Sequence, residues 1–346
     1  MPEPFDRLAC DIARYQAAYV EGYARLCAAR AAAPSSFRMA LDCPAVPTDA
    51  FKVCRVAAFP KEETTRCFRT SGTTLGSRGS HELRDLGSYD AAAVAFGRWS
   101  LAHDLSPRAH LVALAPSPQQ APDSSLSHMI DLFVRTFGVK RADAETYFIQ
   151  GDTLDVAGLD QRIARALVAH EPVLLLATSF ALVFLLEALD EAPFRLPNGS
   201  RVMMTGGFKG RSREIDEAEL RRTLAHTFAV PPRDIAGEYG MTELSSQFYE
   251  GTIRDAGARS GVYVEPPWAR VVPVDPETLA PVAAGEIGMA RIEDLMNVDS
   301  AFAVLASDRV KRVEGGFVLV GRATGATPRG CSIAVDEMLG NETGAS

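Results

Sequence analysis

The sequence lacks the features that mark several common functional classes. Its six cysteines include no C-x-x-C pair and none of the spacings that hold zinc, which favours reduced thiols in a cytoplasm. Positive charge is not in excess, because the formal net charge at pH 7 is −8. Such a chain has no overall field that attracts polyanions, so nucleic acid is not expected as a partner.

Segments suited to a membrane are also missing. The N-terminus, MPEPFDRLACDIARYQ, has no basic region followed by an apolar core, so no signal peptide is predicted. The longest apolar run, residues 173–186, is shorter than the roughly 20 residues that a spanning helix needs. It is predicted to be a buried helix, although its first residues also have the pattern of a strand. A cytoplasmic protein without a membrane span is therefore expected.

A phosphate loop of the Walker type is absent, because no G-x-x-x-x-G-K-[ST] spacing occurs. Residues 70–80, TSGTTLGSRGS, instead combine hydroxyl groups with glycines. Backbone N–H groups and hydroxyls in such a segment can surround a phosphate because glycine permits close approach, and Arg78 adds a fixed positive charge. The alternative is a flexible surface loop, which this composition also suits.

What the sequence does contain is the composition and order of an α/β protein. A chain of 346 residues, 47% of them hydrophobic, can bury a large core. Apolar positions at helical spacing begin the chain, and a helical N-terminal segment is expected over residues 1–60. Further on, short aliphatic runs alternate with helical stretches, which predicts a largely parallel sheet. The predicted strands are His110–Ala115, Val173–Ala177, Val202–Thr205, Ala269–Val274 and Phe317–Val320.

A second informative segment, residues 237–243, reads GEYGMTE. A carboxylate close to a bound triphosphate can hold Mg²⁺, which prefers oxygen ligands, and Glu243 is the candidate. Tyr239 is a candidate for stacking on a purine, and Thr242 for a hydrogen bond to phosphate. Each residue also has an ordinary structural interpretation: the glutamate at a solvated helix start, the tyrosine in a core.

A third segment, residues 306–310, reads ASDRV. It places Asp308 where its carboxylate can accept hydrogen bonds from both hydroxyls of a ribose. Arg322 follows some distance behind, in a Gly-Arg pair. A single aspartate before a strand is usually a turn or cap residue, so this segment carries little weight alone.

Together and in this order, the segments resemble the signatures of the adenylate-forming superfamily, which includes acyl-CoA ligases and peptide-synthetase adenylation domains. The resemblance implies ATP and Mg²⁺ as cofactors, and Glu243 as the residue that binds the metal. It also implies a nucleotide-binding role for a set of matched residues. These are Thr70, Ser71, Gly72, Thr73 and Thr74 in the phosphate loop, Gly206 and Gly207 in a glycine strip over the adenine, Glu238, Tyr239, Gly240 and Thr242 in the adenine motif, and Asp308 and Arg322 at the ribose.

Within that superfamily, the sequence is more similar to the LuxE-type acyl-protein synthetases of the bioluminescence fatty acid reductase system. The similar segments are FRTSGTT at 68–74, DSSLSHM at 123–129, TGGFKGR at 205–211 and DLMNVDS at 294–300. The resemblance covers roughly residues 40–335. It implies an α/β fold, with the large N-terminal-type core of an adenylate-forming enzyme over residues 1–325, mixed or parallel sheets flanked by helices, and a short tail over residues 326–346.

Two departures from the superfamily pattern affect this interpretation. Arg78 stands where the phosphate loop usually carries lysine, so the charge is kept while the contact geometry changes. Only 24 residues follow Arg322, whereas ordinary acyl-CoA ligases continue with a mobile domain of roughly a hundred residues that carries a lysine assisting adenylation. We therefore expect no C-terminal mobile domain, in agreement with the LuxE-type group, which passes its acyl group to a protein cysteine.

The resemblance also singles out a cysteine and a histidine. Cys331 lies near the C-terminus, where a cysteine of the LuxE-type group is acylated, and a flexible tail containing glycine would carry its thiolate to the acyl group. The alternative is a small cysteine packed against the core. His128 lies where related enzymes place an aromatic or histidine residue near the substrate carboxylate. Its alternative is a partly buried histidine with a structural role.

The implied reaction is attack of a carboxylate on ATP to give acyl-AMP, followed by transfer of the acyl group to a thiol. Three functions are left open. The first is a LuxE-type synthetase that feeds a fatty or aryl acyl group, through Cys331, to a partner acyl reductase. The second is a stand-alone adenylating enzyme that loads a carrier protein or a small thiol, and the third is a nucleotide-binding protein without catalysis.

Overall fold

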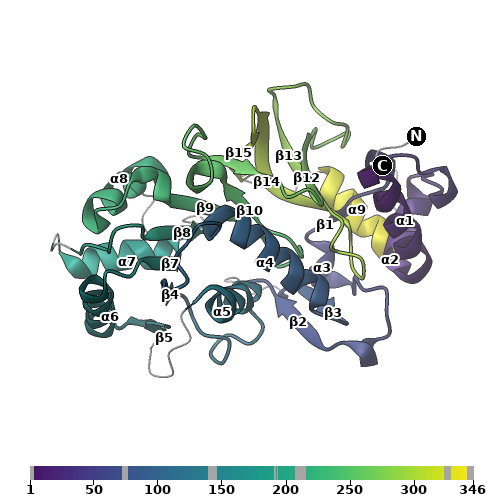
Figure 1. The fold of residues 1–346 in the computed structure, drawn as a ribbon. Coiled ribbons are helices and arrows are strands. Elements are labelled where there is room, and N and C mark those ends of the chain that lie inside the picture. The colour runs from purple at the N-terminus through teal and green to yellow at the C-terminus, as the bar shows by residue number, and fades with distance from the viewer. Residues whose placement is uncertain are drawn as a thin grey trace. The chain divides into compact units, whose positions relative to one another are not determined.

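The structure is a computed structural model that describes residues 4–71, 77–138, 146–190, 192, 194–206, 216–322 and 329–340, with the backbone alone for 329–331 (Figure 1). The chain divides into two compact units, which we call the terminal and the central unit. The terminal unit comprises residues 1–92, 241–246 and 264–346, and the central unit comprises residues 93–240 and 247–263. The prediction of one core over residues 1–325 did not include this division.

The central unit is built on a sheet in which four strands run parallel. Their order is β4 (His110–Leu114), β7 (Val173–Thr178), β8 (Arg201–Thr205) and β9 (Ile235–Tyr239), and β10 (Phe248–Glu250) pairs antiparallel with β9. These strands are nearly continuous buried runs, which is typical of parallel sheets. The other elements are α5 (Ser125–Phe137), β5 (Ile149–Gln150), β6 (Thr153–Leu154), α6 (Val156–Ala169), α7 (Ser179–Leu189), α8 (Glu217–Phe228) and β11 (Val262–Val264), which ends at the unit boundary.

Helices α6, α7 and α8 share one apolar core with the parallel strands. Leu159 of α6, Leu182 of α7 and Phe228 of α8 are fully buried in it. Val112 of β4 and Leu175 of β7 belong to the same cluster. The sheet therefore rests on these helices through branched and aromatic side chains that its alternating strand and helix segments supply.

The long apolar run at residues 173–186 is not one helix. Its first part is strand β7, and helix α7 begins at Ser179. Thr178 separates them, because its hydroxyl oxygen accepts a hydrogen bond from the backbone N–H of Ala181 at 3.1 Å and caps the helix. The predicted strand Val173–Ala177 is confirmed, and the buried-helix prediction is wrong for those residues. An unbroken apolar run fits either a strand or a helix, so only the capping threonine indicates where the helix begins.

The terminal unit contains an antiparallel sheet of the order β12–β13–β14–β15, with β1 parallel to β14. A separate hairpin, β2–β3, precedes α4 (Gly87–Leu101), which begins in this unit and ends in the central one. The strands are β1 (Val46–Pro47), β2 (Arg66–Arg69), β3 (Ser80–Leu83), β12 (Ala269–Val274), β13 (Ile287–Asp294), β14 (Ala303–Val313) and β15 (Gly316–Arg322), and the helices are α1 (Pro4–Tyr19), α2 (Glu21–Ala29), α3 (Ala50–Val53) and α9 (Arg329–Leu339).

The C-terminal segment, predicted to be a short tail, includes helix α9, which lies against α2 (Figure 1). Met338 of α9 is fully buried, and its carbonyl oxygen accepts a hydrogen bond from Nε of Arg25 at 2.6 Å. Arg30, which follows the last residue of α2, forms an ion pair with Glu337 at 2.9 Å. The end of α9 is therefore held by both apolar packing and polar contacts.

All five predicted strands are present, as β4, β7, β8, β12 and β15. The prediction of an α/β protein with parallel and mixed sheets flanked by helices is confirmed. In the part of the chain that the structure describes, no helix combines the length and the apolar character needed to cross a bilayer.

Candidate functional site

The predicted phosphate loop is carried by the β2–β3 hairpin of the terminal unit. At its neck, the Thr70 N–H donates to the Gly79 carbonyl at 3.0 Å, and the Gly79 N–H donates to the Thr70 hydroxyl at 2.9 Å. Arg78 donates from Nε to the Thr70 carbonyl at 2.7 Å. Ser71, beyond this neck, is exposed. The hairpin therefore closes the base of the loop with paired backbone groups and one guanidinium, while Gly72, Thr73 and Thr74 lie outside the described residues.

Glu243 lies in a short turn of the terminal unit, over residues 241–246, and is only 5% exposed. Burial raises the pKa of its carboxyl group to about 7, and the positive charges of Lys52 and Arg322 partly oppose this shift. The negative charge of Asp49, which is paired with Lys52 at 2.6 Å, acts in the same direction as burial. The predicted metal ligand is therefore a buried carboxyl group.

The turn that carries Glu243 is held by the segment that follows β13. Asn297 donates from Nδ2 to the Glu243 carbonyl at 2.7 Å, and its Oδ1 accepts a hydrogen bond from the Ser245 hydroxyl at 2.6 Å. Asp294 accepts from the Ser245 N–H at 2.9 Å and from the Ser246 hydroxyl at 2.7 Å. All of these partners are buried, so the bonds are protected from water.

Residues 294–300 were matched to the family only by their resemblance, and no role was predicted for them. The structure shows that this segment supports the Glu243 turn. A second support comes from α1, where Gln16 donates from Nε2 to the Asn297 carbonyl at 2.7 Å. The available signal was the presence of an aspartate and an asparagine in DLMN, because such residues form hydrogen bonds with backbone groups in turns.

Asp308 and Arg322, the predicted ribose-binding pair, lie opposite each other on β14 and β15. Nε of Arg322 is 2.9 Å from Oδ1 of Asp308. The antiparallel register of β14 and β15 is what brings this pair together.

His81 of β3 is a residue that the sequence analysis left without a role. Its ring is fully buried, and Nδ1 lies 2.8 Å from the Thr242 carbonyl oxygen. Since a carbonyl only accepts, Nδ1 must carry the proton. Burial lowers the pKa of His81 to about 4, so the ring is neutral at physiological pH. The hairpin of the phosphate loop is thereby joined to the residue just before Glu243.

The central unit holds the remaining motif residues. Thr205 and Glu238 are partners in the register of β8 and β9, and the Thr205 hydroxyl donates to the Glu238 carboxylate. Burial raises the pKa of Glu238 to about 7. Gly206, at φ +76°, turns the chain out of β8 in a conformation that favours glycine. Gly207 lies outside the described residues.

Tyr239 is 8% exposed and packs between two aromatic rings of the central unit. Its ring centroid is 6.0 Å from that of Phe248 and 6.1 Å from that of Tyr263. A Cβ atom on Gly240 would lie 2.6 Å from Oε1 of Glu238, which explains glycine at this position. The stacking of Tyr239 on a purine stays a prediction.

His128 and Cys331, the two residues predicted from resemblance to act on the acyl group, both lie in first turns of helices. His128 is in α5, whose N-cap Ser124 accepts from the Ser127 N–H at 3.1 Å, and it is partly buried. The backbone of Cys331 is in α9, two residues after its start, and its side chain lies outside the described part. The roles of both residues stay predictions.

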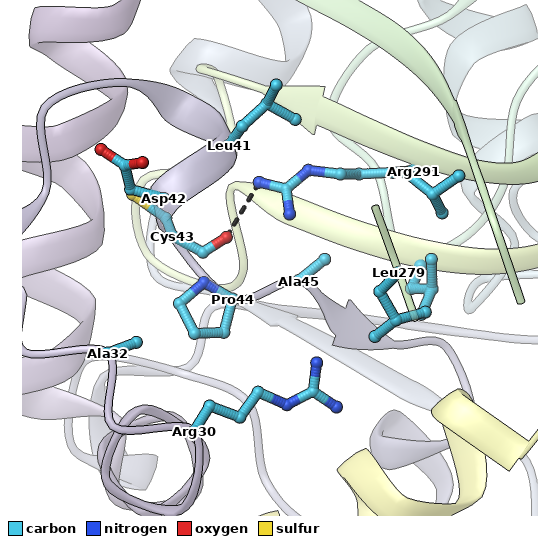
Figure 2. A pocket seen from close by; sticks show the side chains of 11 residues that line it. Arg30, Ala32, Leu41, Asp42, Cys43, Pro44, Ala45, Leu279 and Arg291 are labelled. Carbon is cyan, nitrogen blue, oxygen red and sulfur yellow. Dashed lines mark hydrogen bonds between the residues drawn. The ribbon is translucent and has the colours of Figure 1, made fainter. Parts of the chain in front are cut away.

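A small pocket in the terminal unit, of about 180 Å³, contains none of the predicted site residues (Figure 2). Arg291 points across it and donates to the carbonyls of Ala40 and Cys43 at 2.6 and 2.9 Å. Its Nε also donates to Glu293 at 3.0 Å. The guanidinium is therefore engaged in holding the N-terminal segment, which is a structural role.

Comparison with known proteins places this geometry in context. The sequence model of the family described as acyl-protein synthetase, LuxE, matches residues 7–340. A long-chain-fatty-acid--luciferin-component ligase of Aliivibrio fischeri is 25% identical over 259 residues, which cover 72% of this chain and 64% of that ligase. A ligase of the same name from Vibrio harveyi is 24% identical over 313 residues, which cover 86% of this chain and 78% of that one. The chain thus spans just under two thirds of the length of the first relative.

A solved structure of 2-hydroxyisobutyryl-CoA ligase, in an open conformation with 2-HIB-AMP and CoA, has a TM-score of 0.66 against this chain. The two are 13% identical, and the match covers 94% of this chain and 75% of the ligase. At this identity the likeness concerns the fold. It shows that this chain shares an α/β fold with that ligase.

Proposed function

The chain belongs to the LuxE acyl-protein synthetase family, and on that basis we propose that it forms an acyl-adenylate from a carboxylic acid and ATP and then transfers the acyl group to a thiol. The observation that carries the proposal is the match of the family over residues 7–340, and the buried carboxyl of Glu243 and the Asp308–Arg322 ion pair are in keeping with it. These residues come from separate sequence motifs, and each is proposed to contact the nucleotide or its metal ion.

The proposed substrate is a long-chain fatty acid, because both relatives bear that name. The first step is a displacement at phosphorus. An oxygen of the carboxylate attacks the α-phosphorus of ATP, the bond to the bridging oxygen breaks, and pyrophosphate leaves with the electron pair. The protein's contribution to such a step is mainly positioning and charge stabilisation.

The candidate site residues of the terminal unit each have a proposed role in this step. The neck at Thr70 and Arg78 presents the loop that is proposed to hold the phosphates, and Asp308 is proposed to accept the ribose hydroxyls. In the central unit, the nucleotide contacts predicted for Gly206, Glu238 and Tyr239 are part of the proposal. Support for the whole rests on the match of the family over residues 7–340.

Mg²⁺ fits the residues present. This ion is usually held by one or two carboxylates together with phosphate and water oxygens, and Glu243 offers one buried carboxylate. Among the described residues there is no group of three or more side chains able to hold a metal by themselves, as expected where phosphates complete the shell. When bound, the ion neutralises charge on the triphosphate.

The second step is attack of a thiolate on the acyl carbon of the mixed anhydride. The bond to AMP breaks, a thioester forms, and the thiol proton passes to solvent. We propose Cys331 as the acceptor and an acyl reductase as the partner that consumes the thioester, following the family. The competing possibility is that a carrier protein is the acceptor. The acyl group would then be found on that protein and not on this chain.

The test is acid-dependent exchange of labelled pyrophosphate into ATP, measured with a panel of fatty and aryl acids. Exchange with long-chain fatty acids is the expected result, with reactions that lack acid as the control. Tight ATP binding without exchange for any acid would support a nucleotide-binding protein without catalysis. Mass spectrometry of the chain after incubation with ATP and acid then shows whether the protein itself carries the acyl group.

A further inference from the structure

The backbone on both sides of Glu243 is held by buried side chains. On the N-terminal side, the Thr242 carbonyl accepts the Nδ1–H of His81 at 2.8 Å. On the C-terminal side, the Glu243 carbonyl accepts the Nδ2–H of Asn297 at 2.7 Å. These carbonyls belong to the two peptide groups that flank the Glu243 α-carbon. Because peptide groups are planar, holding both of them restrains φ and ψ of Glu243 and hence the direction of its Cα–Cβ bond.

The two supports come from distant parts of the chain. His81 lies 161 residues before Thr242, on the strand that leaves the phosphate-loop hairpin. Asn297 lies 54 residues after Glu243 and is itself held by Gln16. A movement of the hairpin is therefore passed directly to the Glu243 backbone, because only one hydrogen bond separates them.

The environment of His81 argues for a role beyond packing. Its ring packs edge-on to Phe51, with 6.0 Å between centroids, and it is fully buried. Among the described residues, Nε2 has no hydrogen-bond partner. Leaving a buried acceptor unsatisfied costs stability, so an apolar residue would fold more easily here. The histidine provides a rigid N–H donor toward Thr242, which an apolar residue lacks.

The His81 ring bonds the backbone beside Glu243, at the Thr242 carbonyl. We propose that His81 and Asn297 are positioning residues that hold the carboxylate of Glu243 in register with the phosphate-loop hairpin, so that metal and triphosphate bind together. This inference rests on the proposed function, because it assigns Glu243 to the metal.

The test compares two amide variants that differ in reach. In His81→Asn the amide nitrogen takes the place of Nδ1 and can still donate to Thr242. In His81→Gln it takes the place of Nε2 and points away. The measurement is the affinity for ATP by calorimetry, with Mg²⁺ and with the metal chelated. We expect the tightening by Mg²⁺ to be nearly that of wild type in His81→Asn and to fall about tenfold in His81→Gln.

Phe68→Leu is the matched control. Phe68 is fully buried and faces His81 across the hairpin, but it makes no bond to Thr242. This variant loosens the hairpin and leaves the hydrogen bonds from His81 and Asn297 in place. Its Mg²⁺ effect should therefore stay within about threefold of wild type. Should Phe68→Leu lose as much of the Mg²⁺ effect as His81→Gln, hairpin stability would explain the result, and the inference would be overturned.

Asn297 gives a second route that does not depend on the folding of the histidine variants. Asn297→Asp keeps the shape and the Oδ1 acceptor but removes the amide that donates to the carbonyls of Glu243 and Ala301, and it should reduce the Mg²⁺ effect about tenfold. Equal Mg²⁺ effects in wild type, His81→Gln and Asn297→Asp would overturn the inference while leaving ATP binding intact. Failure of the proposed function looks different, because wild type itself would then show no acid-dependent exchange, whether or not it binds ATP.

Discussion

Arg322 and Asp308 form an ion pair across neighbouring antiparallel strands, with 2.9 Å between Nε and Oδ1. Asp308 is buried, whereas the Arg322 side chain is about half exposed. The guanidinium therefore orients one carboxylate oxygen from the solvent side. A carboxylate held in this way is prepared to accept two hydrogen bonds from a ribose, without first having to become ordered.

Replacement of the carboxylate should weaken nucleotide binding. A hydrogen bond to a charged group is worth about 1.5 to 3 kcal/mol, so Asp308→Ala should lower the affinity for ATP roughly ten- to a hundredfold by calorimetry. Lys311→Ala, on the same strand, changes the charge without touching the pair and serves as the control. Unchanged ATP affinity in Asp308→Ala, together with equal binding of ATP and 2′-deoxy-ATP by wild type, would contradict the ribose assignment.

Glu243→Gln should lose activity and gain stability. Its folded pKa is raised from 4.5 to about 7 by burial, so the protonated group stabilises the fold at low pH and that contribution is lost as pH rises from 4.5 through 7. A glutamine has no charge to bury. At about pH 8 the variant should therefore unfold less readily than wild type, by at most about 3 kcal/mol, while most acid-dependent exchange disappears.

Urea denaturation of the ligand-free protein at about pH 4.5 and pH 8 measures this difference. The gain should be present at the higher pH and small at the lower one, where the wild-type carboxyl is protonated in the folded state and about half protonated in the unfolded state. A gain of the same size at both values would mean that packing and not charge burial is responsible. An exchange rate within about threefold of wild type would remove Glu243 from the chemistry.

Thr205→Val should reveal the charge state of Glu238 in the central unit. The Thr205 hydroxyl lowers the pKa of Glu238, which burial raises to about 7. Above that pH the hydroxyl donates to a carboxylate, and its removal should cost about 1.5 to 3 kcal/mol of stability. Near pH 5 the carboxyl is neutral, and the loss should be closer to 1 kcal/mol.

The matched background for this measurement is Glu238→Gln, which cannot ionise. In that background, Thr205→Val should cost the same at about pH 5 and pH 8. A pH-dependent loss that persists in the glutamine background would assign the effect to another group. Because Thr205 and Glu238 lie in register on β8 and β9, the two changes are expected to couple.

Local sequence patterns predicted the strands, because strand formation depends on neighbouring positions. Aliphatic runs marked β7 and β8, whereas the candidate site residues such as Asp308 came from the resemblance to known motifs. Helix α9 was missed although Ala334 and Met338, both fully buried, are spaced as on one helix face. The segment is short, and its packing partner α2 lies at the other end of the chain.

The two hydrogen bonds that hold the Glu243 turn were not predictable in the same way. The bond from His81 to Thr242 joins residues 161 positions apart, and the bond from Asn297 to Glu243 joins residues 54 apart. Periodicity and turn chemistry act over a few residues, so they do not indicate such pairs. Only the register of the β2–β3 hairpin and the position of the loop after β13 bring these donors to the turn.

The last prediction is that Cys331 accepts the acyl group. Its backbone lies in the first turn of α9, whose last residues are anchored on α2 through Met338 and Arg25. Adenylation precedes the attack of the thiol, so Cys331→Ser should leave pyrophosphate exchange nearly unchanged and abolish any hydroxylamine-sensitive acyl label on the chain.

Cys54 provides the matched control for that experiment. It is a partly exposed free thiol at the end of α3, and burial raises its pKa, which makes it a poor nucleophile. Cys54→Ser should therefore keep the full acyl label. If the label persists in Cys331→Ser, or if wild type is never labelled while an added carrier protein is, the acyl group does not pass through Cys331. The enzyme would then load a separate protein, because adenylation alone requires no cysteine on this chain.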